Sequence, residues 1–166
     1  MITLVLGGTR SGKSAVAERL AAACPGPVTY VATLVPGSDR ELAARIEAHR
    51  ARRPPSWTTV ELGHEPAAAV RSLLGTVIVD SLGGLVATHL DMGIDVAAWC
   101  EALVERGGDT VVVSDEVGMG VHPSTEVGRR FRDALGELNV AVADVADQVL
   151  LVVAGRVLRL DDAGGP

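Results

Sequence analysis

Aromatic side chains and cysteines are scarce in this sequence. Aromatic residues make up only 2% of the 166 residues, so a buried core must be built from Val, Leu, Ile and Ala. The two cysteines, Cys24 and Cys100, stand far apart without metal-ligand spacing, which predicts reduced thiols rather than a zinc site or a disulfide framework. No apolar run approaches the roughly 20 residues of a membrane-spanning helix, and the chain opens on a predicted strand. These features predict a cytoplasmic protein without a signal peptide or a membrane span.

Lysine is almost absent, and the sequence has no excess of positive charge. The net charge of −6 argues against nucleic acid or an anionic membrane as the main partner. Lys13 is the only lysine among the 15 basic residues. The absence of other lysines excludes the N-K-x-D motif with which regulatory GTP-binding switch proteins read guanine, which weighs against that class.

The one lysine lies in a glycine-rich stretch after the first apolar run. Gly7, Gly12, Lys13 and Ser14 fit the pattern G-x-x-x-x-G-K-[ST], between a predicted strand and a predicted helix. Backbone N–H groups of such a loop and the helix N-terminus surround phosphate; the lysine reaches the β- and γ-phosphates, and the serine hydroxyl binds Mg²⁺. The stretch predicts a nucleotide-binding loop made of Gly7, Gly8, Thr9, Arg10, Ser11, Gly12, Lys13 and Ser14.

Strands and helices alternate along the sequence. Strands are predicted at Ile2–Leu6, Val28–Ala32, Thr58–Glu61, Thr76–Asp80, Thr110–Ser114, Gln148–Val153 and Arg156–Leu160. Several of these are continuous apolar runs, as expected of strands buried on both faces of a sheet. Helices are predicted at about 13–24, 39–52, 65–75, 95–106 and 124–145. The alternation predicts one P-loop NTPase-like α/β domain over residues 1–160. It has a mostly parallel, doubly wound sheet with a C-terminal antiparallel edge strand, and a loose tail at 161–166.

Acidic residues end several predicted strands, where ligands bind in such sheets. Asp80 ends an apolar strand in the form of a Walker B segment and is a candidate Mg²⁺ ligand, although a strand-end Asp can also cap the next turn. Glu61 is a second candidate, and a solvated strand-end glutamate explains it equally well on the pattern alone. Asp115 and Glu116 follow another strand and could hold metal or substrate, or start a turn.

A histidine lies among arginines in the stretch 38–53. Ser38 and Glu41 form a capping box, and His49 shares the apolar stripe of the helix that this box begins. A histidine satisfied on the inner face of the helix is one interpretation. The other is a nucleophile toward phosphorus, because clustered arginines repel one another unless an anion binds, and nearby positive charge favours the neutral ring. The arginines are Arg45, Arg50, Arg52 and Arg53.

Five blocks together resemble the bifunctional adenosylcobinamide kinase / adenosylcobinamide-phosphate guanylyltransferase family of cobalamin biosynthesis. They are "LGGTRSGKS" at the N-terminus, "ARIEAHRARRPPSW" at 44–57, "DEVGMGVHP" at 115–123, "GRRFRDALGELN" at 128–139 and "VLLVVAGRVLRL" at 149–160. The resemblance covers nearly the whole chain. It implies a P-loop α/β fold, often a homotrimer, with Mg²⁺ as cofactor and GTP and ATP as substrates.

The resemblance also implies two reactions at one site. A nucleoside triphosphate phosphorylates adenosylcobinamide; GTP then passes GMP to a histidine, which yields it to adenosylcobinamide phosphate, giving adenosylcobinamide-GDP. The histidine of the family falls on His49, which with Lys13 makes the catalytic pair. The remaining nucleotide contacts of the family fall on Thr33, Leu34, Val35, Arg50, Ala51, Arg52, Arg53, Glu61 and Asp80.

Two departures from the family stand near the predicted site. The stretch after Asp80, "SLGGLVATH", lacks the polar and aromatic groups that the family has in a loop there, and Asp115 stands where an Asn is common. An ordinary P-loop small-molecule kinase remains the alternative, because it would explain the glycine-rich loop and Asp80. It would not explain a histidine surrounded by arginines.

Overall fold

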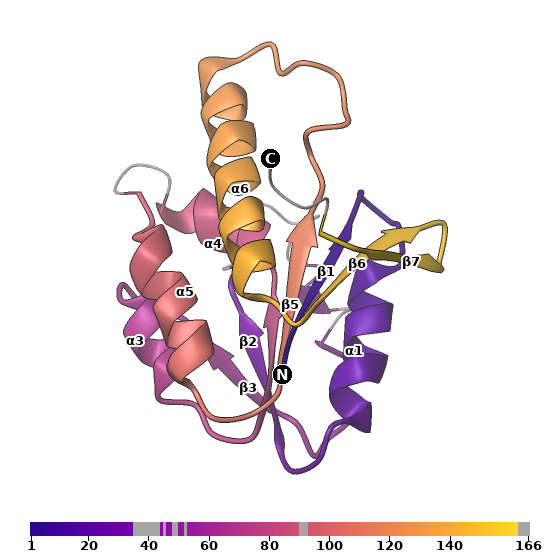
Figure 1. Ribbon diagram of the computed structural model, residues 1–166, viewed down its shortest axis with the longest axis vertical. Helices are drawn as coiled ribbons and strands as arrows, with labels where there is room; N and C mark the ends of the chain where they lie inside the picture. The colour runs from indigo at the N-terminus through magenta and orange to yellow at the C-terminus, as the bar shows by residue number, and fades with distance from the viewer. Residues whose placement is uncertain (35–43, 45, 48–49, 52, 90–92, 163–166) are drawn as a thin grey trace.

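The described residues form a sheet of seven strands, seen edge-on between its helices in Figure 1. The computed structural model describes residues 1–34, 44, 46–47, 50–51, 53–89 and 93–162. The strand order is β3-β2-β4-β5-β1-β6-β7, and every neighbouring pair is parallel except β6 with β7. The strands are β1 (Ile2–Gly7), β2 (Val28–Ala32), β3 (Thr58–Glu61), β4 (Thr76–Asp80), β5 (Thr110–Asp115), β6 (Gln148–Val153) and β7 (Arg156–Leu160). The predicted mostly parallel sheet with an antiparallel C-terminal edge strand is confirmed.

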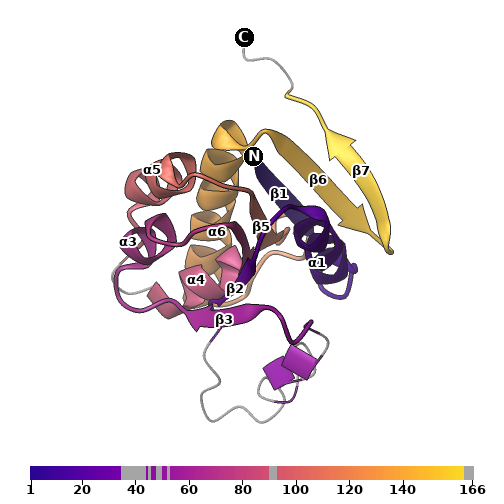
Figure 2. The same ribbon diagram turned by 90° about the horizontal axis from the view of Figure 1, so that it is seen from below.

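Helices cover both faces of this sheet. Figure 2 shows α1 on one face and α3, α4, α5 and α6 grouped on the other. The helices are α1 (Lys13–Ala23), α3 (Pro66–Arg71), α4 (Leu82–His89), α5 (Val96–Glu105) and α6 (Glu126–Val145). None of the helices in the described ranges is long and apolar enough to cross a membrane. Most of the helix predicted at 39–52 lies outside the described residues.

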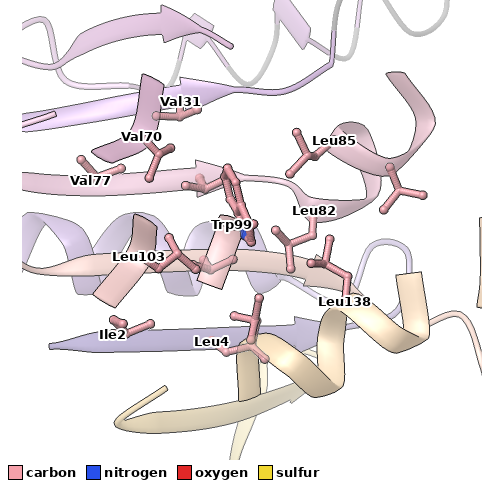
Figure 3. Close-up of a cluster of buried hydrophobic side chains, with 14 of the residues drawn as sticks. Ile2, Leu4, Val31, Val70, Val77, Leu82, Leu85, Trp99, Leu103 and Leu138 are labelled. Carbon is pink, nitrogen blue, oxygen red and sulfur yellow. The ribbon is translucent and has the colours of Figure 1, made fainter. Parts of the chain in front are cut away.

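The two faces of the strands carry two separate cores, because successive strand residues point to opposite sides. On β1, Leu4 packs with the helices α3 to α6, whereas its neighbour Val5 packs against α1. Figure 3 shows the larger cluster, in which Trp99 of α5 lies among Leu82 of α4, Leu138 of α6 and aliphatic strand residues. With so few aromatic residues, both cores are chiefly aliphatic, as the composition predicts.

The predicted elements differ from the observed ones in a few places. β1 and β5 each run one residue further, to Gly7 and Asp115, and α6 begins only at Glu126 because Thr125 accepts a hydrogen bond from Gly128 N–H and caps it. The helix expected at 65–75 is the short α3. The prediction of a loop after Asp80 is wrong: residues 82–89 form the helix α4. The free cysteines Cys24 and Cys100, expected from the sequence as core thiols, are half-buried, and Cys100 packs against the larger core.

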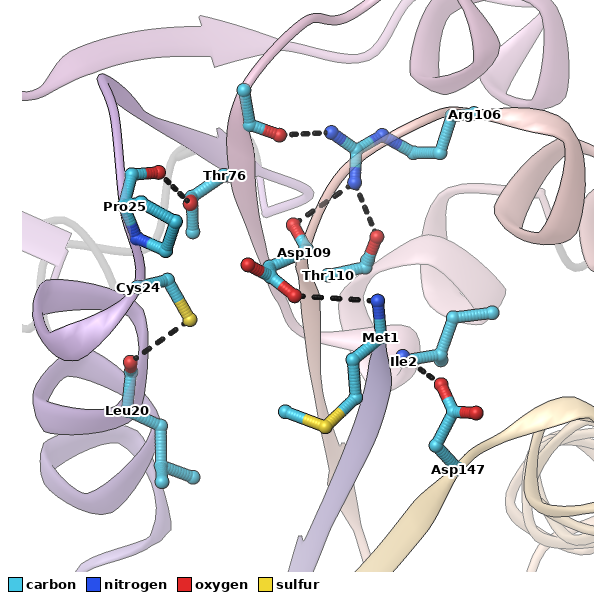
Figure 4. A network of polar contacts seen from close by, with 11 residues as sticks. Met1, Ile2, Leu20, Cys24, Pro25, Thr76, Arg106, Asp109, Thr110 and Asp147 are labelled. Atoms are coloured by element: carbon cyan, nitrogen blue, oxygen red, sulfur yellow. Dashed lines mark hydrogen bonds and ion pairs between the residues drawn. The ribbon is translucent and has the colours of Figure 1, made fainter.

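A polar network fixes the amino ends of the central strands, opposite the ends where ligands bind in such sheets (Figure 4). The amino group of Met1 pairs with Asp109 at 3.2 Å, and Ile2 N–H donates to Asp147 at 2.6 Å. The buried Arg106 donates to the Asp109 carbonyl and to the hydroxyl of Thr110. Desolvation lowers the pKa of the Arg106 guanidinium, and these acceptors offset the cost of burying its charge. The network does not involve the carboxyl ends of these strands, where a ligand site can form.

Candidate nucleotide-binding site

The glycine-rich loop connects β1 to α1 in a conformation suited to anions. Arg10 and Gly12 have φ angles of 58° and 94°, so the backbone turns through the left-handed region twice within three residues. Gly12 is the N-cap of α1, and no side chain caps this end of the helix. The first N–H groups of α1 therefore lack side-chain acceptors, which is the arrangement that binds phosphate.

Lys13 extends over the loop toward the neighbouring strand. Its Nζ donates to the Gly8 carbonyl at 3.2 Å and forms an ion pair with Asp115 Oδ1 at 2.6 Å. The Lys13 side chain is only 11% exposed, so this pair is much less screened than one on the surface. Asp115 ends β5, which lies directly beside β1. An anion at the loop would have to compete with Asp115 for the lysine.

The turn between β6 and β7 supports the same loop from the other end of the chain. Ala154 and Gly155 have φ angles of 50° and 72°, typical of a tight two-residue hairpin turn. Gly155 N–H donates to the Ser11 carbonyl at 2.8 Å. A Cβ on Gly12 would lie 3.4 Å from Gly155 Cα, so the turn packs closely against the loop.

Across from the loop, Asp80 is held by a tyrosine. Tyr30 OH donates to Asp80 Oδ2 at 2.6 Å, and the guanidinium carbon of Arg53 lies 3.4 Å from the centre of the Tyr30 ring. Burial, with the nearby Asp80 carboxylate, raises the pKa of Tyr30, so its hydroxyl stays a donor. Arg53 Nη1 also donates to Thr59 at 3.2 Å, while its Nε is buried without an acceptor in the described part of the chain.

Thr33 fastens the ends of β2 and β4 together beside Asp80. Its buried hydroxyl donates to the Ser81 carbonyl at 2.6 Å and accepts from Ser81 N–H at 2.8 Å. These bonds continue the β2–β4 pairing beyond the last strand residues, Ala32 and Asp80. The role of Thr33 in this structure is to fix the two strand ends.

These residues surround one cavity of about 120 Å³ at the carboxyl ends of the strands. The glycine-rich loop and α1 form one wall, and β2, β4 and Arg53 form the other. The lining residues are Lys13, Ser14, Tyr30, Ala32, Leu34, Ile46, Arg53, Asp80, Ser81 and Asp115. Cations, carboxylates and a hydroxyl meet here, and such a mixture suits a phosphate ester with a divalent cation.

A family model described as "Cobinamide kinase / cobinamide phosphate guanyltransferase" matches residues 3–160. The chain belongs to this family. It is 42% identical over 170 residues to "Bifunctional adenosylcobalamin biosynthesis protein CobP" of Pseudomonas aeruginosa, covering 96% of this chain and 97% of the relative. It is 35% identical over 178 residues to "Bifunctional adenosylcobalamin biosynthesis protein CobU" of Salmonella typhimurium, covering 93% and 97%.

The similarity to solved structures concerns the fold alone. An ATPase from the type III secretion system of pathogenic bacteria superimposes with a TM-score of 0.54 at 11% identity, covering 90% of this chain and 50% of that chain. The predicted P-loop NTPase-like fold is thus confirmed, and membership of the cobinamide kinase / guanyltransferase family makes the protein an enzyme.

The predicted site residues fall into three groups. Lys13, Ser14, Leu34, Arg53 and Asp80 line the cavity, and residues 7–12 form the loop beside it. Thr33 is buried next to the cavity, whereas Arg50 and Ala51 are exposed and Glu61 is exposed at the end of the edge strand β3. Val35, His49 and Arg52 lie outside the described residues, so their roles stay predictions.

Five lining residues were not among the predicted contacts. Two of them, Tyr30 and Asp115, have side chains that make polar contacts with predicted site residues; the other three are Ala32, Ile46 and Ser81. Tyr30 lies inside a predicted buried strand, and its signal was available: a phenol buried in a strand requires a hydrogen-bond partner. The sequence marks Asp115 as a possible metal or substrate ligand that stands where the family commonly has Asn. Only the strand order shows that it reaches Lys13. The glycines after Asp80 also have a reason in the structure. A Cβ on Gly83 would lie 2.9 Å from Asp115 Oδ2, and one on Gly84 would collide with Thr33 Oγ1.

Proposed function

We propose that this chain catalyses both reactions implied by its family, at the cavity between the glycine-rich loop and Asp80. GTP or ATP would phosphorylate the hydroxyl of adenosylcobinamide. GTP would then guanylylate His49, and the GMP would pass to adenosylcobinamide phosphate to give adenosylcobinamide-GDP. The observation that carries the proposal is the match of residues 3–160 to the family, together with Lys13, Arg53 and Asp80 around one cavity.

In both reactions the triphosphate would bind at the N-terminus of α1. Lys13 would leave Asp115 and stabilise charge on the β- and γ-phosphates, since a compact ammonium on a flexible stem can follow the phosphates. Arg53 would hold a phosphate oxygen from the opposite wall. Its buried Nε, without an acceptor among the described residues, supports an anion at this position.

The residues present fit a magnesium ion carried in with the nucleotide. Asp80 and Ser14 offer oxygen donors on the same cavity, and the described residues contain no group of three or more His, Cys, Asp or Glu side chains that would form a complete cage. Magnesium commonly binds through one or two protein oxygens, phosphates and water. When bound, it would neutralise phosphate charge, while Asp80 and Ser14 hold it in place.

The guanylyl transfer would use the neutral ring of His49. A ring nitrogen attacks the α-phosphorus of GTP, and pyrophosphate leaves with the electrons of the broken P–O bond. A phosphate oxygen of the acceptor then attacks the same phosphorus and releases the histidine nitrogen. The family supports this role through the sequence around His49.

The experiment is to incubate the enzyme with GTP labelled at the α-phosphorus and to measure label retained after denaturation. The parent should retain an acid-labile, base-stable adduct, and less of it should form as the pH of the incubation falls through the imidazole pKa. His49→Ala should retain no label while keeping substantial kinase turnover. His64→Ala is the matched control, because His64 is exposed and absent from the cavity lining. An unlabelled parent with kinase activity would make the protein an ordinary P-loop kinase; an acid-labile adduct on His49→Ala would place the nucleophile elsewhere.

The homotrimer and the cytoplasmic location implied by the resemblance and the composition also stay proposals, as does the single domain over residues 1–160. Light scattering on purified protein would determine the number of subunits. The edge strand β7, whose outer side has no neighbouring strand among the described residues and on which Val157 and Leu158 are exposed, supports contact with another copy.

A further inference from the structure

Three side chains from distant parts of the sequence, Arg53, Tyr30 and Asp80, contact one another in a row along one wall of the cavity. The guanidinium of Arg53 covers the Tyr30 ring at 3.4 Å, and the hydroxyl of the same ring donates to Asp80 at 2.6 Å. Arg53 and Asp80 both line the cavity, while Tyr30 is only 2% exposed. A single rigid ring thus contacts the two charged groups on which this wall depends.

The sheet fixes the position of that ring. Tyr30 lies in the middle of β2, where its register partner on the adjacent parallel strand β4 is Ile78. Its side chain packs in the cluster beneath α1 with Val5 and Val113. From there the hydroxyl reaches Asp80, at the end of β4, and occupies Oδ2. Asp80 Oδ1 is not used in this bond, so the tyrosine selects which carboxylate oxygen can face the cavity.

We propose that Tyr30 is a positioning residue: it orients Asp80 toward a divalent cation and holds the Arg53 guanidinium where it can contact the phosphates. This inference rests on the proposed function, because it assumes that a metal–nucleotide complex occupies the cavity. The hydroxyl serves Asp80 and the ring face serves Arg53. The two contributions can therefore be removed one at a time.

Three variants separate them. Tyr30→Phe removes the hydroxyl and keeps the ring under Arg53. Tyr30→Leu removes both. Thr59→Val is the matched control, since it removes a hydrogen-bond partner of Arg53 and leaves both the ring under Arg53 and the Tyr30–Asp80 bond intact.

The measurement is binding of a non-hydrolysable GTP analogue without metal, followed by Mn²⁺ binding to the complex by electron paramagnetic resonance. Tyr30→Phe should bind the analogue like the parent but Mn²⁺ about 10-fold more weakly, the usual effect of losing an outer-shell partner of a metal ligand. Tyr30→Leu should weaken both steps. Thr59→Val should leave Mn²⁺ binding within about twofold of the parent, because Asp80 keeps its hydrogen bond. Mn²⁺ binding to Tyr30→Phe that equals or exceeds that of the parent overturns the proposal.

A second readout needs no variant and therefore does not depend on the mutants folding. Tyr30 is the only tyrosine of the chain, so ultraviolet resonance Raman bands of tyrosine report on it alone. Saturating the parent–analogue complex with Mn²⁺ should shift these bands, because charge on Asp80 is drawn toward the metal. Bands that do not move overturn the proposal. A parent that binds the analogue but neither phosphorylates cobinamide nor accepts GMP would instead refute the proposed function, while these binding results would stand.

Discussion

The two walls of the cavity are built in different ways. The loop wall comes from consecutive residues, Gly7 to Ser14, whose turn and helix N-terminus are local to one stretch of chain. The strand wall combines Tyr30, Arg53 and Asp80, which lie 50 residues apart at the extremes. They meet because β2 pairs with β4 on one side and with β3, to which Arg53 is bonded through Thr59, on the other. The loop wall thus depends on local backbone conformation, and the strand wall depends on the register of the sheet.

This difference shows where each kind of substitution should act. On the loop wall, the charge of Lys13 would face the phosphates, and backbone N–H groups would supply the remaining contacts. On the strand wall, the buried Tyr30 contacts both Arg53 and Asp80. The binding contributed by these two charged groups should therefore depend on an uncharged residue. Substitutions that remove a charge from one wall or the other test this contrast directly.

Lys13→Ala should give the largest loss. Removing the only ammonium at the loop should slow both reactions by about 10²–10³-fold, because the charge on the β- and γ-phosphates then loses one of its stabilising partners. Steady-state rates of cobinamide phosphorylation and GMP transfer check this, with thermal unfolding to show that the fold survives. Arg19→Ala on the exposed side of the same helix is the control. Near-parental turnover in either reaction would contradict a shared site.

Arg53→Gln should have the next largest effect. It should weaken GTP binding about 10-fold, since a half-buried charge-assisted hydrogen bond is lost. Arg50→Gln should change affinity less than twofold, because Arg50 is exposed and absent from the cavity lining. Calorimetry at two ionic strengths measures both, and the effect at Arg53 should depend little on salt. Equal effects at the two positions would mean that the arginines act only through their summed charge.

Asp115→Asn should have the smallest effect, and in the opposite direction. It should tighten GTP binding about fivefold, or about 1 kcal/mol, because Lys13 no longer has to leave a carboxylate. Asp133→Asn, which removes an exposed carboxylate paired with Arg132, is the control for net charge. If Asp115→Asn binds GTP no better than the parent, then Asp115 does not compete with the phosphates.

The sequence is a good guide to the strands and to the loop wall. The strands β2, β3, β4, β6 and β7 have the bounds that the sequence predicts. Buried parallel strands such as β4 are continuous apolar runs, whereas β3 and β7 lie at the edges of the sheet and are largely exposed. The phosphate loop is predicted from a short motif, because its conformation is determined by residues that lie close together in the sequence. A sequence motif suffices for such features, because every residue involved lies within a few positions of the next.

The helix α4 and the strand wall could not be predicted in the same way. Gly83 and Gly84 reduce helix propensity, so the stretch after Asp80 has the composition of a loop. Their small size is instead required by close packing against Asp115 and Thr33. Likewise, nothing near Tyr30 in the sequence indicates Asp80 or Arg53. Both features depend on contacts between segments, and those contacts exist only after the strands have taken their order.

The hydrogen bond between Gly155 and Ser11 has a consequence for the protein as it is being made. The phosphate loop is synthesised before β6 and before the turn that supports Ser11, which follow it by about 140 residues. In a nascent chain, Ser11 therefore lacks this hydrogen bond until β6 and the turn after it have joined the sheet. Nucleotide in the cell would protect finished chains from proteases and leave interrupted ones exposed, so that the ligand itself would distinguish complete from incomplete products of translation.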